Sequence, residues 1–100
     1  MAVAAVLFAP NYVFLDADAN PIAGGKLFTY EAGLSTPLAT YSDASLTTPN
    51  TNPIILNSSG FSDTMIFSLD QAYKVDLFDA NDVQVPGWPR DTYGVAAPDF

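Results

Sequence analysis

Carboxylates and amides at alternate positions of one short loop are the strongest candidates for binding chemistry in this sequence. The segment Asp16-Ala-Asp18-Ala-Asn20 resembles the first half of a calcium loop, whose oxygens at positions one, three and five converge on the ion. Such a loop needs glycine at position six and glutamate at position twelve, where this chain has Pro21 and Leu27. We therefore predict an Asx turn without metal or cofactor, and the same kind of turn at Asp79-Ala-Asn81-Asp82.

Acidic residues are also the most abundant groups that could act in catalysis, as the paired carboxyls of a glycoside hydrolase do. Glu31 and ten aspartates are available, but nothing in their spacing selects a pair. The sequence has no histidine, no cysteine and no G-x-S-x-G motif to supply a base or a nucleophile. These observations predict a protein that is not an enzyme, and the lack of cysteine excludes a disulfide framework.

Aromatic side chains could instead bind a sugar by stacking, which keeps a small carbohydrate-binding module as an alternative. The candidates are Trp88, Tyr12, Tyr30, Tyr41, Tyr73 and Tyr93. Trp88 lies between Pro86-Gly87 and Pro89, where we expect its ring to cap the end of a sandwich. The tyrosines at positions 30, 41 and 73 fall in predicted strands, where packing in the core or between subunits is the expected role.

The charge balance limits the partners of this chain. The formal net charge is −8, and the only cations are Lys26, Lys74 and Arg90. Three cations cannot build the basic footprint that binds nucleic acid or an anionic membrane, so we expect neither partner. Charged residues make up 14% of the chain, below the usual share of about a quarter. Much apolar surface should therefore need cover, which favours an oligomer or a larger assembly over a compact monomer with a Ser/Thr/Asn surface.

Short alternating runs separated by turn residues predict an all-β chain, a small antiparallel β-sandwich or two packed sheets with little helix. We expect at least six short strands and under about 15% helix. The expected strands cover residues 12–15, 26–32, 38–42, 53–57, 61–69, 72–79 and 83–85. Residues 61–69 and 72–79 form the best hairpin candidate, joined at Asp70-Gln71.

Period-two alternation also predicts which side chains are buried. We expect these to be Phe28, Tyr30, Ile55, Ile66, Val75 and Leu77, within one chain or between chains. The apolar start, residues 2–9, lacks a basic region and is too short to cross a membrane, so we interpret it as an extended arm or a first edge strand ending at Pro10. The chain then divides into an arm (1–10), one β module (11–93) and a tail (94–100).

The order of turns and strands between residues 11 and 93 resembles the N-terminal virion-attachment module of bacteriophage tail fibres and tailspikes. The segments that carry this resemblance are GGKLFTY (24–30), Glu31-Ala32-Gly33, ATYSD (39–43), NPIILN (52–57) with Gly60, and YKVDLFDAND (73–82). The chain departs from the pattern after its two Asx turns, where Pro21 and Asp82 replace the usual glycine.

The resemblance implies a trimeric, mostly β head-binding domain that docks on the tail machine, while polysaccharide cleavage belongs to a separate, larger β-helical domain. It therefore implies a non-enzymatic virion structural protein, made in the host cytoplasm and located at the tail or head–tail region. Its partners would be other copies of itself and tail, portal or capsid proteins. The chain would be an adaptor, or the attachment piece of a longer fibre; a capsid decoration subunit is the alternative within the same class.

Exposed apolar residues near the ends are the candidate assembly contacts. They are Val3, Val6, Leu7, Phe8, Trp88 and Tyr93. We expect the arm before Pro10 to add a strand to the sheet of a neighbouring subunit, because an exposed edge pairs readily through its main chain. Deletion of residues 2–9 should then block assembly and leave the fold intact.

Overall fold

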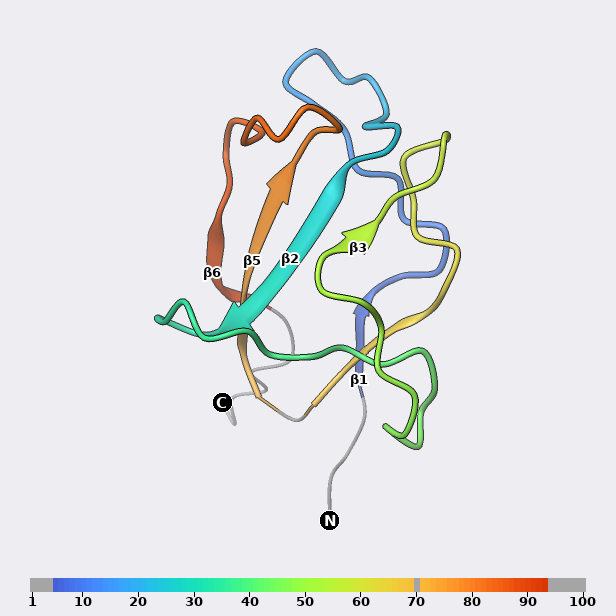
Figure 1. The fold of residues 1–100 in the computed structure, drawn as a ribbon, viewed down its shortest axis with the longest axis vertical. Coiled ribbons are helices and arrows are strands. Elements are labelled where there is room, and N and C mark those ends of the chain that lie inside the picture. Colours follow the sequence, from blue (N-terminus) through green and yellow to red (C-terminus); the bar gives the residue numbers. More distant parts are fainter. Residues whose placement is uncertain (1–4, 70, 94–100) are drawn as a thin grey trace, which may run out of the picture.

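A computed structural model describes residues 5–69 and 71–93, without the side chains of Ala5, Thr92 and Tyr93 (Figure 1). The described residues form six strands and no helix, which confirms the predicted all-β fold. The strands are β1 (Ala5–Phe8), β2 (Lys26–Glu31), β3 (Ile54–Ile55), β4 (Ile66–Ser68), β5 (Tyr73–Phe78) and β6 (Arg90–Tyr93). The expected tail, residues 94–100, lies outside the described part.

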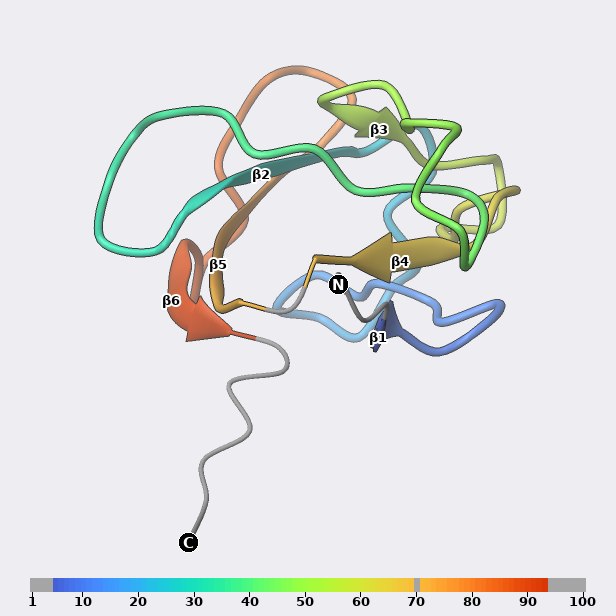
Figure 2. The ribbon, with the colours of Figure 1, turned by 90° about the horizontal axis from the view of Figure 1, so that it is seen from below.

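The six strands make two antiparallel sheets. One has the order β3-β2-β5-β6, and the other pairs β1 with β4. A bridge from Tyr41 to Phe67 extends the second sheet beyond β4. Figure 2 shows β1 and β4 in one layer and β2 and β3 in the other. The expected pair of packed sheets is therefore the architecture of this chain.

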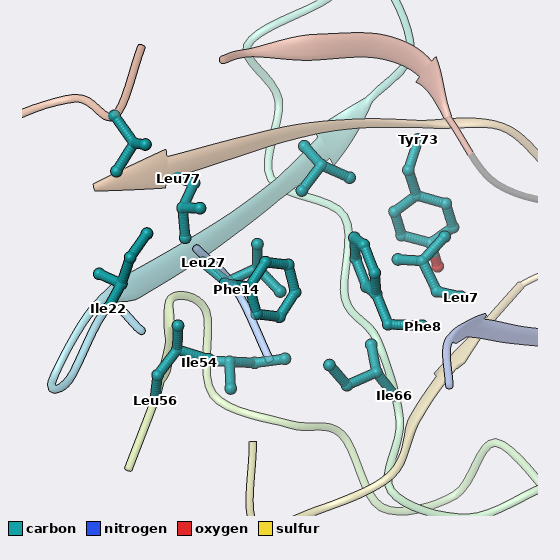
Figure 3. Close-up of a cluster of buried hydrophobic side chains, with 12 residues drawn as sticks. Leu7, Phe8, Phe14, Ile22, Leu27, Ile54, Leu56, Ile66, Tyr73 and Leu77 are labelled. Atoms are coloured by element: carbon teal, nitrogen blue, oxygen red, sulfur yellow. The ribbon is translucent and has the colours of Figure 1, made fainter. Parts of the chain in front are cut away.

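A single core lies between the two sheets (Figure 3). In the larger sheet, Leu27 of β2 is paired with Leu77 of β5, and both are fully buried. Strands β1 and β4 cover this layer with apolar side chains, and loop residues close its ends. The buried apolar residues are Leu7, Phe8, Phe14, Ile22, Leu27, Ile54, Leu56, Ile66, Tyr73, Val75, Leu77 and Val85.

Burial within the chain is confirmed for the predicted residues of β4 and β5. It is not found for those of β2 and β3, whose burial between chains stays a prediction. Ile66, Val75 and Leu77 are buried as expected. Phe28 and Tyr30 are only half-buried, and Ile55 is 55% exposed. The alternation in KLFTYEA places apolar side chains on both faces of β2, so the sequence pattern fits either orientation. The pairing of Leu27 with Leu77 decides it, because directly opposed residues share a face.

The predicted hairpin between residues 61–69 and 72–79 is also wrong. Strand β4 pairs with β1, whereas β5 pairs with β2 and β6, so the chain passes from one sheet to the other between them. The buried phenol of Tyr73 marks this crossing: it donates a hydrogen bond to the Ala39 carbonyl (2.7 Å) and accepts one from the Leu69 N–H (3.0 Å). Turn residues predict where a chain reverses, but they do not specify which strand it then meets.

Residues 12–15, 38–42 and 83–85 also differ from expectation, because they form only isolated bridges in place of strands. Leu15 bridges Pro21, Tyr41 bridges Pro49 and Phe67, and Gln84 bridges Phe78. In the opposite direction, β6 follows the Pro-Gly-Trp-Pro segment, where the sequence indicated only a break. Short segments of this kind gain too few ladder hydrogen bonds for local sequence to distinguish them from loops.

Four turns share one hydrogen-bonding design. Each begins with an Asp or Asn whose side-chain oxygen accepts bonds from backbone N–H groups two to five residues on, and the residue three positions on has a positive φ. The first residues are Asp16, Asp43, Asn57 and Asp79. The positive-φ residues are Ala19, Leu46, Gly60 and Asp82. The predicted Asx turns at Asp16 and Asp79 are thus confirmed, and their carboxylates hold their own loops.

Truncating Phe8 should destabilise the protein strongly, because its ring is 3% exposed and lies 4.9 Å, centroid to centroid, from that of Phe14. We expect Phe8→Ala to lower the free energy of unfolding by about 3–5 kcal/mol in chemical denaturation. Val6→Ala on the same strand is the control, since Val6 is 48% exposed, and it should cost under about 1 kcal/mol. Equal losses would contradict the assigned inner face of β1.

Removing the Tyr73 hydroxyl should lower the free energy of unfolding by about 1–3 kcal/mol, because it leaves the Ala39 carbonyl and the Leu69 N–H without their partner. Burial is the main cause that raises the pKa of Tyr73, with a smaller contribution from Tyr41. The folded pKa then exceeds the unfolded value of about 10, so stability is full below that pH and falls as the pH rises above it.

Unfolding of the wild type and of Tyr73→Phe should therefore be compared at neutral pH and above pH ~10. The variant should lose less stability over this alkaline range. Tyr12→Phe, which removes a phenol from a 45% exposed side chain, is the matched control and should behave as the wild type. A Tyr73→Phe variant with unchanged stability would mean that the phenol does not join the two sheets.

Candidate interaction surface

Two of the predicted assembly contacts lie in the core of their own chain. Leu7 and Phe8 belong to β1, which pairs with β4, and both side chains are buried. The interpretation of residues 5–8 as a free arm is thereby corrected in favour of the alternative, a first edge strand. Deletion of residues 2–9 would remove part of the core, so we no longer expect it to leave the fold intact. Val6 faces outward, and Val3 lies outside the described residues.

Trp88 packs against the core from the segment before β6, and its expected position at the end of the sandwich stays a prediction. Its ring is half-buried, packs against the core cluster and lies 6.3 Å from that of Phe14, centroid to centroid. The guanidinium carbon of Arg90 is 4.5 Å from the Trp88 ring centre, which is a cation–π distance. The backbone of Tyr93 pairs with Tyr73 in the sheet, while its side chain is outside the described part. These positions favour structural roles for Trp88 and Arg90.

The acidic residues do not come together in the part of the chain that the structure describes. Residues 5–69 and 71–93 hold no group of three or more His, Cys, Asp or Glu side chains arranged for a metal ion. Three of the carboxylates, those of Asp16, Asp43 and Asp79, accept hydrogen bonds within their own turns. The same residues include no helix long and apolar enough to cross a membrane.

The outer surface of the larger sheet carries a cluster of aromatic rings. We call this surface the aromatic face and define it by the residues of β2, β3 and β5 that point away from the core. These residues are Lys26, Phe28, Tyr30, Ile55, Lys74, Asp76 and Phe78. The strand register places them side by side: Lys26 is opposite Ile55 and Phe78, Phe28 opposite Asp76, and Tyr30 opposite Lys74.

Ring contacts hold the middle of the aromatic face together. Phe28 and Phe78 meet edge to face, with centroids 5.4 Å apart and planes at 79°. Phe28 and Tyr30 have nearly parallel planes, at 4°, with centroids 6.3 Å apart along β2. The ammonium of Lys74 lies 5.4 Å from the Tyr30 ring centre. Such contacts order the rings while leaving them partly accessible to solvent.

Polar groups on and beside the aromatic face are paired. Asp76 accepts two hydrogen bonds from the Gln84 amide, at 2.9 and 3.1 Å, and Lys26 forms an ion pair with Asp82. Burial is the main cause that raises the pKa of Tyr30, and the negative charge of Asp76 raises it further. With the bordering Asp82, the aromatic face holds two cations and two anions, and it is formally neutral.

The sequence did not identify this surface, because its pattern predicted burial of Phe28 and Tyr30 within one chain or between chains without distinguishing the two. One signal was present in KLFTYEA: a strand with apolar residues on both faces needs cover on both.

No protein-family model matches the sequence, and a search of curated proteins finds no significant match.

Neutralising Asp76 should lower the pKa of Tyr30 toward its ordinary value of about 10, because the carboxylate disfavours the phenolate. Asp76→Asn tests this in an NMR titration of the Tyr30 ring. Asp18→Asn removes the same charge from an exposed loop outside the sheet and should leave the Tyr30 titration unchanged. Equal titrations in both variants would contradict the proximity of Tyr30 and Asp76.

Proposed function

We propose that this protein is a non-enzymatic structural subunit of a bacteriophage virion, a tail fibre or tailspike attachment module or adaptor that anchors as a trimer to the tail or portal. The observation that carries the proposal is the ordered series of turn and strand motifs between Gly24 and Asp82. The motif residues that the next paragraphs describe hold the fold, and a shared attachment module would keep such positions while its surface varies.

Two glycines of these motifs, Gly25 and Gly60, occupy positions where a side chain would not fit. A Cβ on Gly25 would lie 2.6 Å from Cγ2 of Ile22 and 3.1 Å from the Phe78 carbonyl oxygen. Gly60 has a φ of 86°, and a Cβ there would lie 2.9 Å from the Ile22 nitrogen. Both glycines therefore allow β2 and its neighbouring loops to approach closely.

The side chain of Asn52, at the start of NPIILN, makes the hydrogen bonds to β2 that a neighbouring strand would otherwise make. Its side-chain oxygen accepts a bond from the Thr29 N–H (3.0 Å), and its amide donates to the Thr29 carbonyl (2.8 Å). Gly33, which ends Glu31-Ala32-Gly33, donates its N–H to the Asp91 carboxylate (2.9 Å) and so joins the turn after β2 to β6. These contacts give the motif residues structural roles, which supports a resemblance at the level of the fold.

The proposal is tested on purified virions of the phage whose genome encodes this sequence. Mass spectrometry should detect the protein in particles, and antibody-labelled electron microscopy should place it at the tail or the head–tail junction. Label spread over the whole capsid would favour a decoration subunit instead. Absence from purified particles would contradict a virion function of either kind.

A groove beside the larger sheet favours carbohydrate binding as the second candidate function. Its volume is about 330 Å³, at the lower end of the usual range for ligand sites, and Ile54 and Ile55 form its apolar part. Hydroxyl, amide and carboxylate side chains that can bond to sugar hydroxyls supply the rest of its lining: Ser42, Thr48, Asn50, Thr51, Ser62, Asp63 and Thr64. A glycan array decides this point: specific binding that Asn50→Ala abolishes would support the alternative.

A further inference from the structure

Three rings of the aromatic face are linked by contacts on the outer side of the larger sheet. Phe28 is the centre, in contact with Tyr30 along its own strand and with Phe78 on β5. The rings are half-buried, and Ile55 at the border of the face is 55% exposed. Strand β2 thus packs Leu27 against the core and presents Phe28 and Tyr30 outward, as strands do that are covered on both sides.

We propose that copies of this chain pack against one another through the aromatic face. The proposal rests on the proposed function in one respect, because it names the contact that would hold the subunits of that homo-oligomer together. In this arrangement the exposed edges of Phe28, Tyr30 and Phe78 meet those of the next copy, and the sheet gains its second cover.

Charge favours a second copy as the occupant of this face. The two lysines of the face are balanced by Asp76 and the bordering Asp82, so the formal charge of −8 arises from the other nine acidic residues and Arg90. Two copies repel each other through those nine acids and approach with the least repulsion through the neutral face. A basic protein would be drawn to the acidic remainder of the molecule.

The two charged residues of β5 make the contact self-complementary. Lys74 and Asp76 lie two positions apart on the same side of the strand, with Val75 between them pointing into the core. Every copy presents the same cation and the same anion, so around the three-fold axis of the proposed trimer the Lys74 of each copy can lie near the Asp76 of the next. This pairing sets opposite charges against each other and keeps like charges apart.

The test measures association of the full-length chain by analytical ultracentrifugation over a range of concentrations and at low and high salt. The wild type should associate, and added salt should strengthen or leave unchanged this association, since it screens repulsion between acidic copies. Phe28→Lys and Ile55→Lys should each weaken association about tenfold or more, because they place an extra charge in the contact. Val6→Lys makes the same charge change on the exposed side of β1 and should associate as the wild type.

Circular dichroism and thermal unfolding of each variant establish that it is folded. If Phe28→Lys does not fold, Ile55→Lys decides the outcome, because Ile55 is largely exposed. If the folded variants associate as tightly as the wild type, the aromatic face is not the contact and the oligomer uses another interface. Equal weakening by Val6→Lys would overturn it as well.

Two other outcomes separate this inference from the proposed function. A wild-type chain that stays monomeric, or whose association weakens with added salt, overturns the inference, whereas the virion experiment still decides the proposed function. A monomer that binds a glycan on the array, with binding lost in Phe28→Lys, would assign the same rings to carbohydrate. If the protein is present in virions and Ile55→Lys still forms the oligomer, the proposed function stands and the aromatic face is not the contact.

Discussion

The antiparallel pairing of β2 with β5 is the constraint on which the rest of the structure depends. It places Leu27 opposite Leu77 and Thr29 opposite Val75, and these four side chains form the floor of the core. The same register sends Phe28, Tyr30 and Phe78 to the other side of the sheet. A shift of one residue would exchange the two faces, since side chains alternate along a strand. The core and the aromatic face are therefore two consequences of one pairing.

Side-chain hydrogen bonds to backbone groups supplement the few backbone hydrogen bonds of the short strands. Strand β3 has only two residues, so beyond it the Asn52 amide bonds to both backbone groups of Thr29. The Thr29 hydroxyl donates to the Leu38 carbonyl, at 2.6 Å, and the Tyr73 phenol joins the loop before Tyr41 to the end of β4. A small chain without cysteine is held in this way by buried polar contacts as well as by its apolar core.

The placement of the motif residues on the two sides of the larger sheet is consistent with the structural role proposed for this chain. In the motifs that resemble phage attachment modules, Gly25, Gly60 and Asn52 hold the sheets and loops together, while the outward-facing residues of the same motifs form the aromatic face. Most of the negative charge lies off the aromatic face, which distinguishes that face from the rest of the surface. Two of the three cations of the chain, Lys26 and Lys74, lie on this face, and their positions reduce its negative charge.

The sequence by itself determined the features that depend on near neighbours: the all-β class and the Asx turns at Asp16 and Asp79. Each follows from backbone preferences or from residues a few positions apart. Only the tertiary structure decided that β4 pairs with β1, that Leu7 and Phe8 enter the core, and that Phe28 and Tyr30 face outward. These outcomes depend on strand pairings between residues far apart in the chain, and because apolar side chains occur on both faces of β2, the local pattern fitted either orientation. The aromatic face, the strongest candidate site, was therefore visible only once the register was known.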